Sequence, residues 1–172
     1  VMKQVEMSLS PFNDSSTISR INRGETTMTD SLLRRVFIMS QKVNSASGGM
    51  FDPTVSPLVD LWGFGWKNPG HEPQQAEIDS AVALVGIDSC RLFPDGTIAK
   101  KHPGTQFNFS AITKGYGVDL VAEMLHRNGC SDYLVEIGGE IAMRGNNPRG
   151  EAWRVMIDAP VSNDTSVTHS RM

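Results

Sequence analysis

The residues best suited to chemistry lie in a glycine-containing turn that leads into a helix. Segment 108–119 reads Asn-Phe-Ser-Ala-Ile-Thr-Lys-Gly-Tyr-Gly-Val-Asp, with alternating residues before it and an apolar pattern of helical period after it. A strand-to-helix turn presents backbone N–H groups, and Lys114 in the first helical turn adds positive charge, which suits a phosphate. A capped helix with a surface lysine explains the same residues, because neither GxGxxG nor the Walker pattern is present.

Helices and hairpins are predicted around this turn. Apolar residues trace one helical face over 32–43, where Thr29 is a suitable N-cap, and another over 118–125. Strands are predicted around Leu92, Phe107, Leu134, Met143 and Val155. Because hairpin turns are expected at 94–96 and 147–148, the strands should pair antiparallel. The sequence therefore predicts an α+β fold with a mainly antiparallel sheet and helices packed against it.

Length and composition fit one domain or part of one. The 172 residues are 39% apolar and 20% charged, which is enough to bury one core. A net charge of -3 gives no reason to expect binding to nucleic acid. No apolar run approaches the length of a membrane-spanning helix, and the first residues lack a signal-peptide pattern. Cys90 and Cys130 form no CxxC pair, and the sequence leaves open whether they are bonded.

Three other segments contain residues that can either bind a ligand or pack. Phe12 lies in a polar turn, where Ser16 or Thr17 can cap a short helix. Asp52 follows a pair of glycines and precedes a proline, so it can face a ligand or form an Asx-turn. The aromatic segment 61–66 can be a stacking platform for a flat ring or a packed corner under a loop, and we favour the packed corner.

Four blocks of the sequence, taken together, resemble the ApbE family of FAD:protein FMN transferases. They lie at 12–22, 48–65, 108–119 and 133–140, in the order of the family, and cover most of the chain. The second block contains the run Asp-Pro-Thr-Val-Ser-Pro-Leu-Val-Asp-Leu-Trp-Gly-Phe-Gly, which is too long for a chance match. The resemblance implies an ApbE-like, T-fold-like α+β domain.

The same resemblance implies which residues bind the ligands. It assigns contacts with FAD to Phe12, Met50, Phe51, Asp52, Asn108 and Lys114. It assigns a ligand of Mg²⁺ to the main-chain carbonyl of Ala111, and it leaves the catalytic residues unknown. Two positions depart from the family pattern. Phe12 stands where tyrosine is common and lacks its hydroxyl, and Asn108 stands where aspartate is usual and lacks its negative charge.

The reaction implied by the resemblance is a magnesium-dependent transfer of FMN from FAD to a target protein. A threonine hydroxyl of the target attacks the phosphate on the flavin side of the diphosphate, FMN stays attached, and AMP leaves. Such chemistry depends on neutralising the diphosphate charge and on fixing the line of attack. Two alternatives stay open, a FAD pyrophosphatase that gives FMN and AMP, and a non-catalytic FAD-binding fragment.

The resemblance also implies features that lie outside these residues. Family members continue further, with a late block whose Asp and Thr supply most of the magnesium ligands. We therefore expect residues 1–172 to be a single ApbE-like domain that is truncated at both ends and lacks its C-terminal portion. An unfinished sheet predicts self-association through a bare edge or apolar face. Family membership further implies a lipoprotein, anchored to the inner membrane and facing the periplasm.

Overall fold

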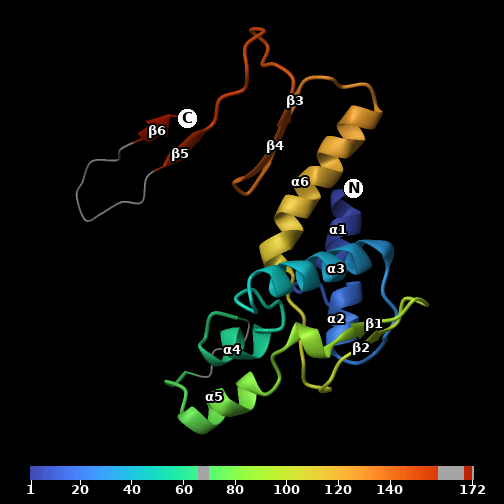
Figure 1. The fold of residues 1–172 in the computed structure, drawn as a ribbon, viewed down its shortest axis with the longest axis vertical. Helices are drawn as coiled ribbons and strands as arrows, with labels where there is room; N and C mark the ends of the chain where they lie inside the picture. Colours follow the sequence, from blue (N-terminus) through green and yellow to red (C-terminus); the bar gives the residue numbers. More distant parts are fainter. Residues whose placement is uncertain (66–69, 159–168, 172) are drawn as a thin grey trace. The chain divides into compact units, whose positions relative to one another are not determined.

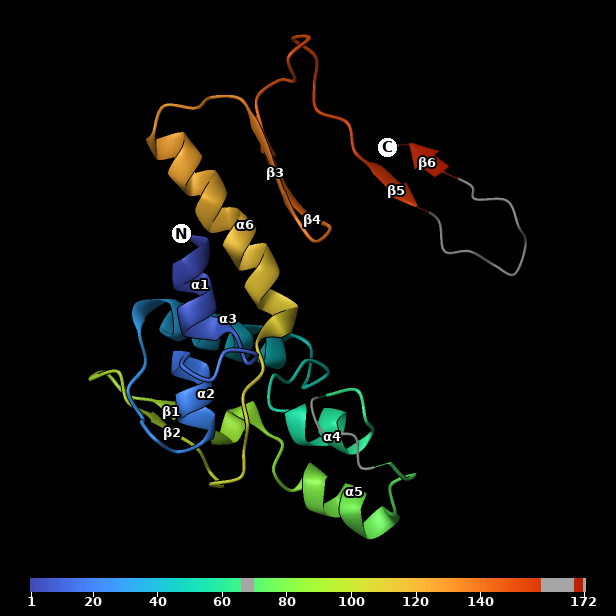
Figure 2. The ribbon, with the colours of Figure 1, turned by 180° about the vertical axis from the view of Figure 1, so that it is seen from behind.

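The computed structural model describes residues 1–65, 70–158 and 169–171, and the chain divides into two compact units, Val1–Gly117 and Val118–Met172. Figures 1 and 2 show the ribbon from opposite sides. The helices are α1 (Met2–Leu9), α2 (Thr17–Asn22), α3 (Ser31–Ala46), α4 (Ser56–Leu61), α5 (Gln75–Val82), the 3-10 helix η1 (Ile87–Ser89) and α6 (Ser110–Arg127). The strands are β1 (Arg91–Leu92), β2 (Ile98–Ala99), β3 (Tyr133–Ile137), β4 (Glu140–Arg144), β5 (Met156–Asp158) and β6 (His169–Arg171).

The strands pair as antiparallel hairpins, which confirms the predicted α+β class. In the described part of the chain they form three two-stranded sheets, β1–β2, β3–β4 and β5–β6, rather than one larger sheet. The segment around Phe107, predicted as a strand, belongs to none of them. Its main chain is instead hydrogen-bonded to the side chain of Asn22, which replaces the neighbouring strand as a partner.

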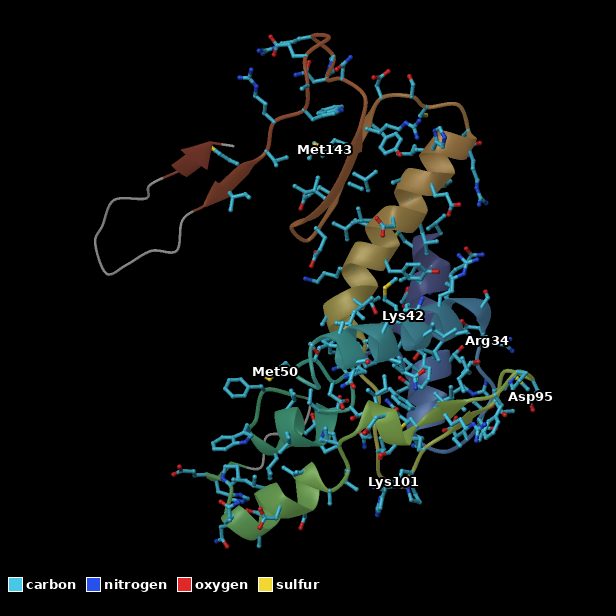
Figure 3. The ribbon with its side chains drawn as sticks, in the orientation of Figure 1. Arg34, Lys42, Met50, Asp95, Lys101 and Met143 are labelled. Carbon is cyan, nitrogen blue, oxygen red and sulfur yellow. The ribbon has the colours of Figure 1, made fainter. Side chains whose placement is uncertain are left out.

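Helix α3 is joined to the β1–β2 hairpin at its start. Its N-cap is Asp30 rather than the predicted Thr29, and Asp30 Oδ1 accepts two main-chain N–H groups of the first turn at 3.0 and 2.9 Å. The Thr29 hydroxyl donates to the Gly96 carbonyl at 2.6 Å. Arg34 donates to the Asp95 carbonyl in the same hairpin turn, and both residues are labelled in Figure 3. The predicted hairpin at 94–96 is confirmed.

Asp30 is expected to make folding sensitive to acid. Burial acts to raise its pKa, but hydrogen bonds from the Ser8 hydroxyl and the start of α3 outweigh burial, so the pKa lies below its ordinary value. Stability from such a group is present above the unfolded-state pKa and is lost as pH falls through the folded-state pKa. Below about pH 4, the free energy of unfolding should therefore fall more steeply in the wild type than in Asp30→Asn. Urea unfolding from about pH 6 down to about pH 2.5 measures both slopes, and equal slopes would contradict the prediction.

The core of the first unit holds the segment that precedes α6. Helix α1 packs against α2 and α3, and α3 packs against η1 (Figure 1). The largest fully buried side chains are Phe37, Phe107 and Phe109. The Phe107 ring meets Phe37 edge-on, with centroids 5.8 Å apart, and stacks on Phe109 at the same distance. The chain entering α6 is therefore fixed to α3 through its aromatic side chains.

The second unit has a small core of its own. Val118 and Ala122 on α6 and Val135 on β3 are its buried members. Strands β3 and β4 are joined by Gly138 and Gly139, whose φ angles of 60° and 95° favour glycine. The strand predicted around Val155 begins one residue later, at Met156.

The structure bears on the cysteines and on membrane-spanning helices. Cys90 is buried, Cys130 is exposed, and both are free thiols. No helix among the described residues is long and apolar enough to cross a membrane. The single domain, the truncation and the self-association stay predictions.

Candidate functional site

A cavity of about 640 Å³ opens in the first unit between the turn before α2, helix α4 and the segment before α6. Its lining combines aromatic rings with a few charged and amide side chains, among them Phe12, Asp14, Arg23, Asp60, Phe64 and Asn108. Aromatic rings beside polar side chains can together hold a flat ring system with polar edges. We therefore treat this cavity as the candidate ligand site.

The turn before α2 presents Phe12 to the cavity. The Ser16 hydroxyl donates to the Ser10 carbonyl at 2.7 Å and accepts the N–H of Ser19 at 3.1 Å, which closes the turn and caps α2. Of the two caps considered from the sequence, Ser16 and Thr17, the structure uses Ser16. Phe12 at the tip of the turn is 67% exposed, so its ring lies outside the core and lines the cavity.

The aromatic segment after α4 is exposed, so the packed corner favoured from the sequence was wrong for Trp62 and Phe64. Trp62 is 48% exposed, and Phe64 is 84% exposed and lines the cavity. The physical reason lies in Gly65, where an added Cβ would overlap the carboxylate of Asp60. The chain folds back closely on α4 at this point and leaves Phe64 outside the core. Trp66, the last aromatic of the segment, lies outside the described residues.

Asn108 links the cavity to the start of α6. Its main-chain N–H donates to the Pro53 carbonyl at 2.7 Å, and its side-chain Oδ1 accepts the N–H of Ser110 at 2.9 Å. Such an Asx-type contact satisfies an N–H that has no partner within the helix. Helix α6 begins here, earlier than the sequence pattern indicated. Lys114 is exposed and lies one turn further along the same helix.

In the loop after α3, Met50 is exposed to solvent, and the side chain of Asp52 forms hydrogen bonds that hold the loop. Met50 is 91% exposed (Figure 3), and Phe51 is partly buried. The Asp52 carboxylate accepts three hydrogen bonds, two from the N–H and hydroxyl of Thr54 at 2.8 and 2.6 Å, and one from the N–H of Ile87 at 3.0 Å. The Asx-turn considered from the sequence is present, and its second oxygen ties the loop to η1.

The structure brings only part of the predicted site into the cavity itself. Phe12 and Asn108 line it together. Among the described residues, its lining does not include Met50, Phe51, Asp52, Ala111 or Lys114. The hydrogen bond from Asn108 to Pro53 nevertheless joins the loop of Asp52 to the cavity wall. The predicted residues therefore occupy adjoining parts of one unit.

The magnesium ligand predicted at Ala111 lies in the first turn of α6. Helix geometry directs its carbonyl along the helix axis toward the N–H of Gly115, four residues on. Mg²⁺ takes octahedral oxygen ligands and usually binds at least one carboxylate. In the described ranges, no group of three or more His, Cys, Asp or Glu side chains is placed to hold a metal. The magnesium ligand at Ala111 therefore stays a prediction.

Charges around the cavity favour an uncharged ring over a phosphate. Arg23 is held by Glu25, with Nε and Oε1 2.6 Å apart, and by Asp14 at 3.6 Å. The hydrogen bond from Arg23 holds the pKa of Glu25 below its ordinary value, so the pair stays ionised near neutral pH. Asp60 adds a further carboxylate to the lining. A diphosphate is better placed at the start of α6, where the helix dipole and Lys114 supply positive potential.

The ApbE family model matches residues 1–171, and the chain belongs to the ApbE family. A FAD:protein FMN transferase of Haemophilus influenzae is 34% identical over 170 residues, which cover 94% of this chain and 49% of that protein. The structure of flavin transferase ApbE from Vibrio cholerae matches with a TM-score of 0.91 at 34% identity, over 98% of this chain and 55% of that one.

The apo form of the Pseudomonas stutzeri flavinyl transferase ApbE matches with a TM-score of 0.84 at 33% identity, over 91% of this chain and 53% of that one. These matches confirm the family resemblance and the ApbE-like fold inferred from the sequence. The chain spans about half the length of the curated relatives it matches. The activity, substrates and partners of the whole protein are therefore proposals.

Sequence reasoning gave no role to Asn22 and Asp60, which the structure brings to the cavity. Asp60 follows the apolar residues of α4 and reads as an ordinary surface carboxylate. Asn22 ends a short helix, where a polar residue is expected, and its partner lies 85 residues away. One available signal was the position of Asn22 at the end of the first family block.

Proposed function

We propose that this protein is a FAD:protein FMN transferase, which moves FMN from FAD to a threonine hydroxyl of a target protein and releases AMP. The observation that carries the proposal is the family match over residues 1–171, together with relatives that bear this name. A FAD-sized ligand also suits the adjoining features of the first unit. A cavity lined by aromatic rings and amide groups would accept the flavin ring, and the start of α6 would accept the diphosphate.

The chemistry of the proposed transfer is balanced by the two substrates. The threonine Oγ forms a bond to the phosphorus on the flavin side, the bond from that phosphorus to the bridging oxygen breaks, and AMP leaves with the electron pair. The hydroxyl proton passes to solvent or to a base that we do not assign. Lys114 would stabilise the charge on the diphosphate oxygens, and the helix start would hold the diphosphate in one orientation. Dependence on Mg²⁺ is part of the proposal, with the Ala111 carbonyl as one ligand and the others unassigned.

A transfer assay tests the proposal. The protein is incubated with FAD, Mg²⁺ and a threonine-containing acceptor protein from the same organism, and FMN attached to the acceptor is measured by in-gel flavin fluorescence. The assay is run first with residues 1–172 and then with any longer form of the polypeptide. The form that transfers FMN is called the transfer-competent form below. Matching controls omit FAD, Mg²⁺ or the acceptor, or replace the acceptor threonine by valine.

Other outcomes of the assay separate the alternatives. Free FMN and AMP at equal rates with and without acceptor would identify a FAD pyrophosphatase and overturn the transferase proposal. Binding of FAD without turnover in every form would identify a non-catalytic FAD-binding protein. The proposed location, anchored to the inner membrane and facing the periplasm, is tested separately by protease accessibility in spheroplasts.

Replacing Phe64 with alanine is expected to weaken FAD binding by about threefold to tenfold, because stacking against an aromatic ring contributes about 0.5–1.5 kcal/mol. Phe64 is 84% exposed, so its removal should leave the melting temperature unchanged. The matched control is Phe93→Ala, which removes a surface phenylalanine next to β1, away from the cavity lining. Titration of flavin fluorescence in the transfer-competent form measures both. Equal affinities of Phe64→Ala and Phe93→Ala would exclude Phe64 from the flavin site.

A further inference from the structure

We propose that Asn22 is a positioning residue of the FAD site, which fixes the main chain of Phe107 and, through it, Asn108 and the start of α6. This inference rests on the proposed function, because it gives the start of α6 a role in orienting the diphosphate. Asn22 itself is the last residue of α2 and lines the candidate cavity.

The contact between Asn22 and Phe107 uses both groups of the amide side chain. Asn22 Nδ2 donates to the Phe107 carbonyl at 2.8 Å, and Asn22 Oδ1 accepts the Phe107 N–H at 2.8 Å. A paired donor and acceptor reproduce the pattern that a neighbouring β-strand would offer to this residue. The main chain of Asn22 is held as well, since Lys100 Nζ donates to its carbonyl at 3.2 Å. The side chain therefore acts as a fixed two-point clamp.

The clamp is connected through Phe107 and Asn108 to the start of α6. Phe107 is fully buried, so its side chain cannot shift to follow a displaced main chain. Asn108 comes next, with its N–H on Pro53 and its Oδ1 on the N–H of Ser110. These hydrogen bonds thus connect three segments that are distant in the sequence: the end of α2, the loop after α3, and the start of α6. Displacing reacting groups by about 1 Å can lower a rate by about a hundredfold.

Loss of the clamp should therefore affect turnover more than binding of the flavin ring. In the transfer-competent form, Asn22→Ala is expected to lower kcat by about tenfold to a hundredfold, with a change in the KM for FAD of less than about threefold. Amide exchange at Phe107 and Ser110 should rise at the same time, because their main-chain groups lose a partner or its support.

Asn22→Asp provides a readout that a merely structural role would not give. Its carboxylate still accepts the Phe107 N–H but repels the Phe107 carbonyl, whereas the protonated acid can donate to that carbonyl as Asn22 does. The ratio of its kcat to that of the wild type should therefore rise as pH is lowered from about 8 to about 5, since burial and a facing carbonyl favour the protonated form. Asn22→Ala should show no such rise.

Thr29→Val is the matched control. It removes two hydrogen bonds of the Thr29 hydroxyl, one donated to the Gly96 carbonyl and one accepted from Arg34 Nε. Both lie at the β1–β2 hairpin and not at the cavity. Thr29→Val should lower the melting temperature and leave kcat unchanged at temperatures where the protein is folded. An equal loss of kcat in Thr29→Val and Asn22→Ala would show that Asn22 affects kcat only through the stability of the fold, and it would overturn the inference.

The inference and the proposed function fail in different ways. If the wild type transfers FMN but Asn22→Ala keeps the wild-type kcat, the positioning role is wrong and the proposed function stands. If no form of the wild type transfers FMN, the proposed function is wrong, and amide exchange still decides whether Asn22 clamps the segment. Unchanged exchange at Phe107 and Ser110 in Asn22→Ala would overturn the clamp itself.

Discussion

Lys114→Ala is expected to lower FMN transfer by about tenfold to a hundredfold in the transfer-competent form. A charge-assisted contact with a phosphate contributes about 1.5–3 kcal/mol, and each 1.4 kcal/mol is about a factor of ten. Lys114 is exposed and lies one turn into α6, so its ammonium group can reach an anion bound at the helix start. The free energy of unfolding should change by less than about 0.5 kcal/mol, because exposed surface substitutions rarely exceed this.

Two other lysine variants make the Lys114 measurement specific. Lys114→Arg keeps the charge and should retain more activity than Lys114→Ala, although its planar group presents the charge differently. Lys101→Ala removes an exposed lysine that follows β2 and does not line the cavity (labelled in Figure 3), and it should leave transfer unchanged. Steady-state rates at varied FAD concentrations measure all three. If Lys114→Ala and Lys101→Ala behave alike, Lys114 is a surface lysine on a capped helix.

Residues 1–172 alone are expected to bind FAD weakly and to transfer no detectable FMN, whether or not Mg²⁺ is added. The reason is the metal. Mg²⁺ gives up its water shell reluctantly, and the Ala111 carbonyl within a helix does not replace it. Asn108 contributes an amide where the family usually carries a carboxylate, and the Asp52 oxygens already accept three hydrogen bonds. Without the ion, the diphosphate keeps its charge and binds poorly.

Titration of FAD into residues 1–172, with and without Mg²⁺, tests this expectation. The flavin transferase ApbE of Vibrio cholerae is a suitable positive control, because its structure matches this chain with a TM-score of 0.91 and extends beyond the matched part. Tight binding by the 172 residues that is strengthened by Mg²⁺ would contradict the prediction. It would also show that these residues hold a complete site.

Local sequence patterns were enough to predict the helix over 32–43 and the hairpin at 94–96. The exact residue at which the helix begins depends on tertiary contacts. The helix over 32–43 and the hairpin at 94–96 are present, because each has a clear periodicity or turn sequence. The N-cap was misplaced by one residue, since Thr29 and Asp30 are both suitable caps and the choice depends on a distant partner. Thr29 bonds to Gly96, which leaves the cap to Asp30. No local rule contains that contact.

The candidate site was predicted less completely than the fold for a similar reason. Phe107 has the alternation of a strand, but its main chain is bonded to an amide side chain 85 residues away. Phe64 reads as part of a buried aromatic corner, and only the close approach of Asp60 to Gly65 shows why it remains exposed. The family resemblance assigned FAD contacts to Phe12 and Asn108. It could not show that a cavity joins them.

The two thiols of the chain differ in a way that equips it for selective labelling. Cys130 is exposed, whereas Cys90 is 3% exposed, and burial raises the pKa of its thiol above the ordinary value. A maleimide reacts with accessible thiolates, so one equivalent should modify Cys130 in the native protein and spare Cys90. A fluorophore can thus be attached at a single site without any mutation. The slower rate at which Cys90 reacts then measures how often the first unit opens. A further decrease of this rate in the presence of FAD would indicate that FAD binds, in an experiment that does not depend on turnover.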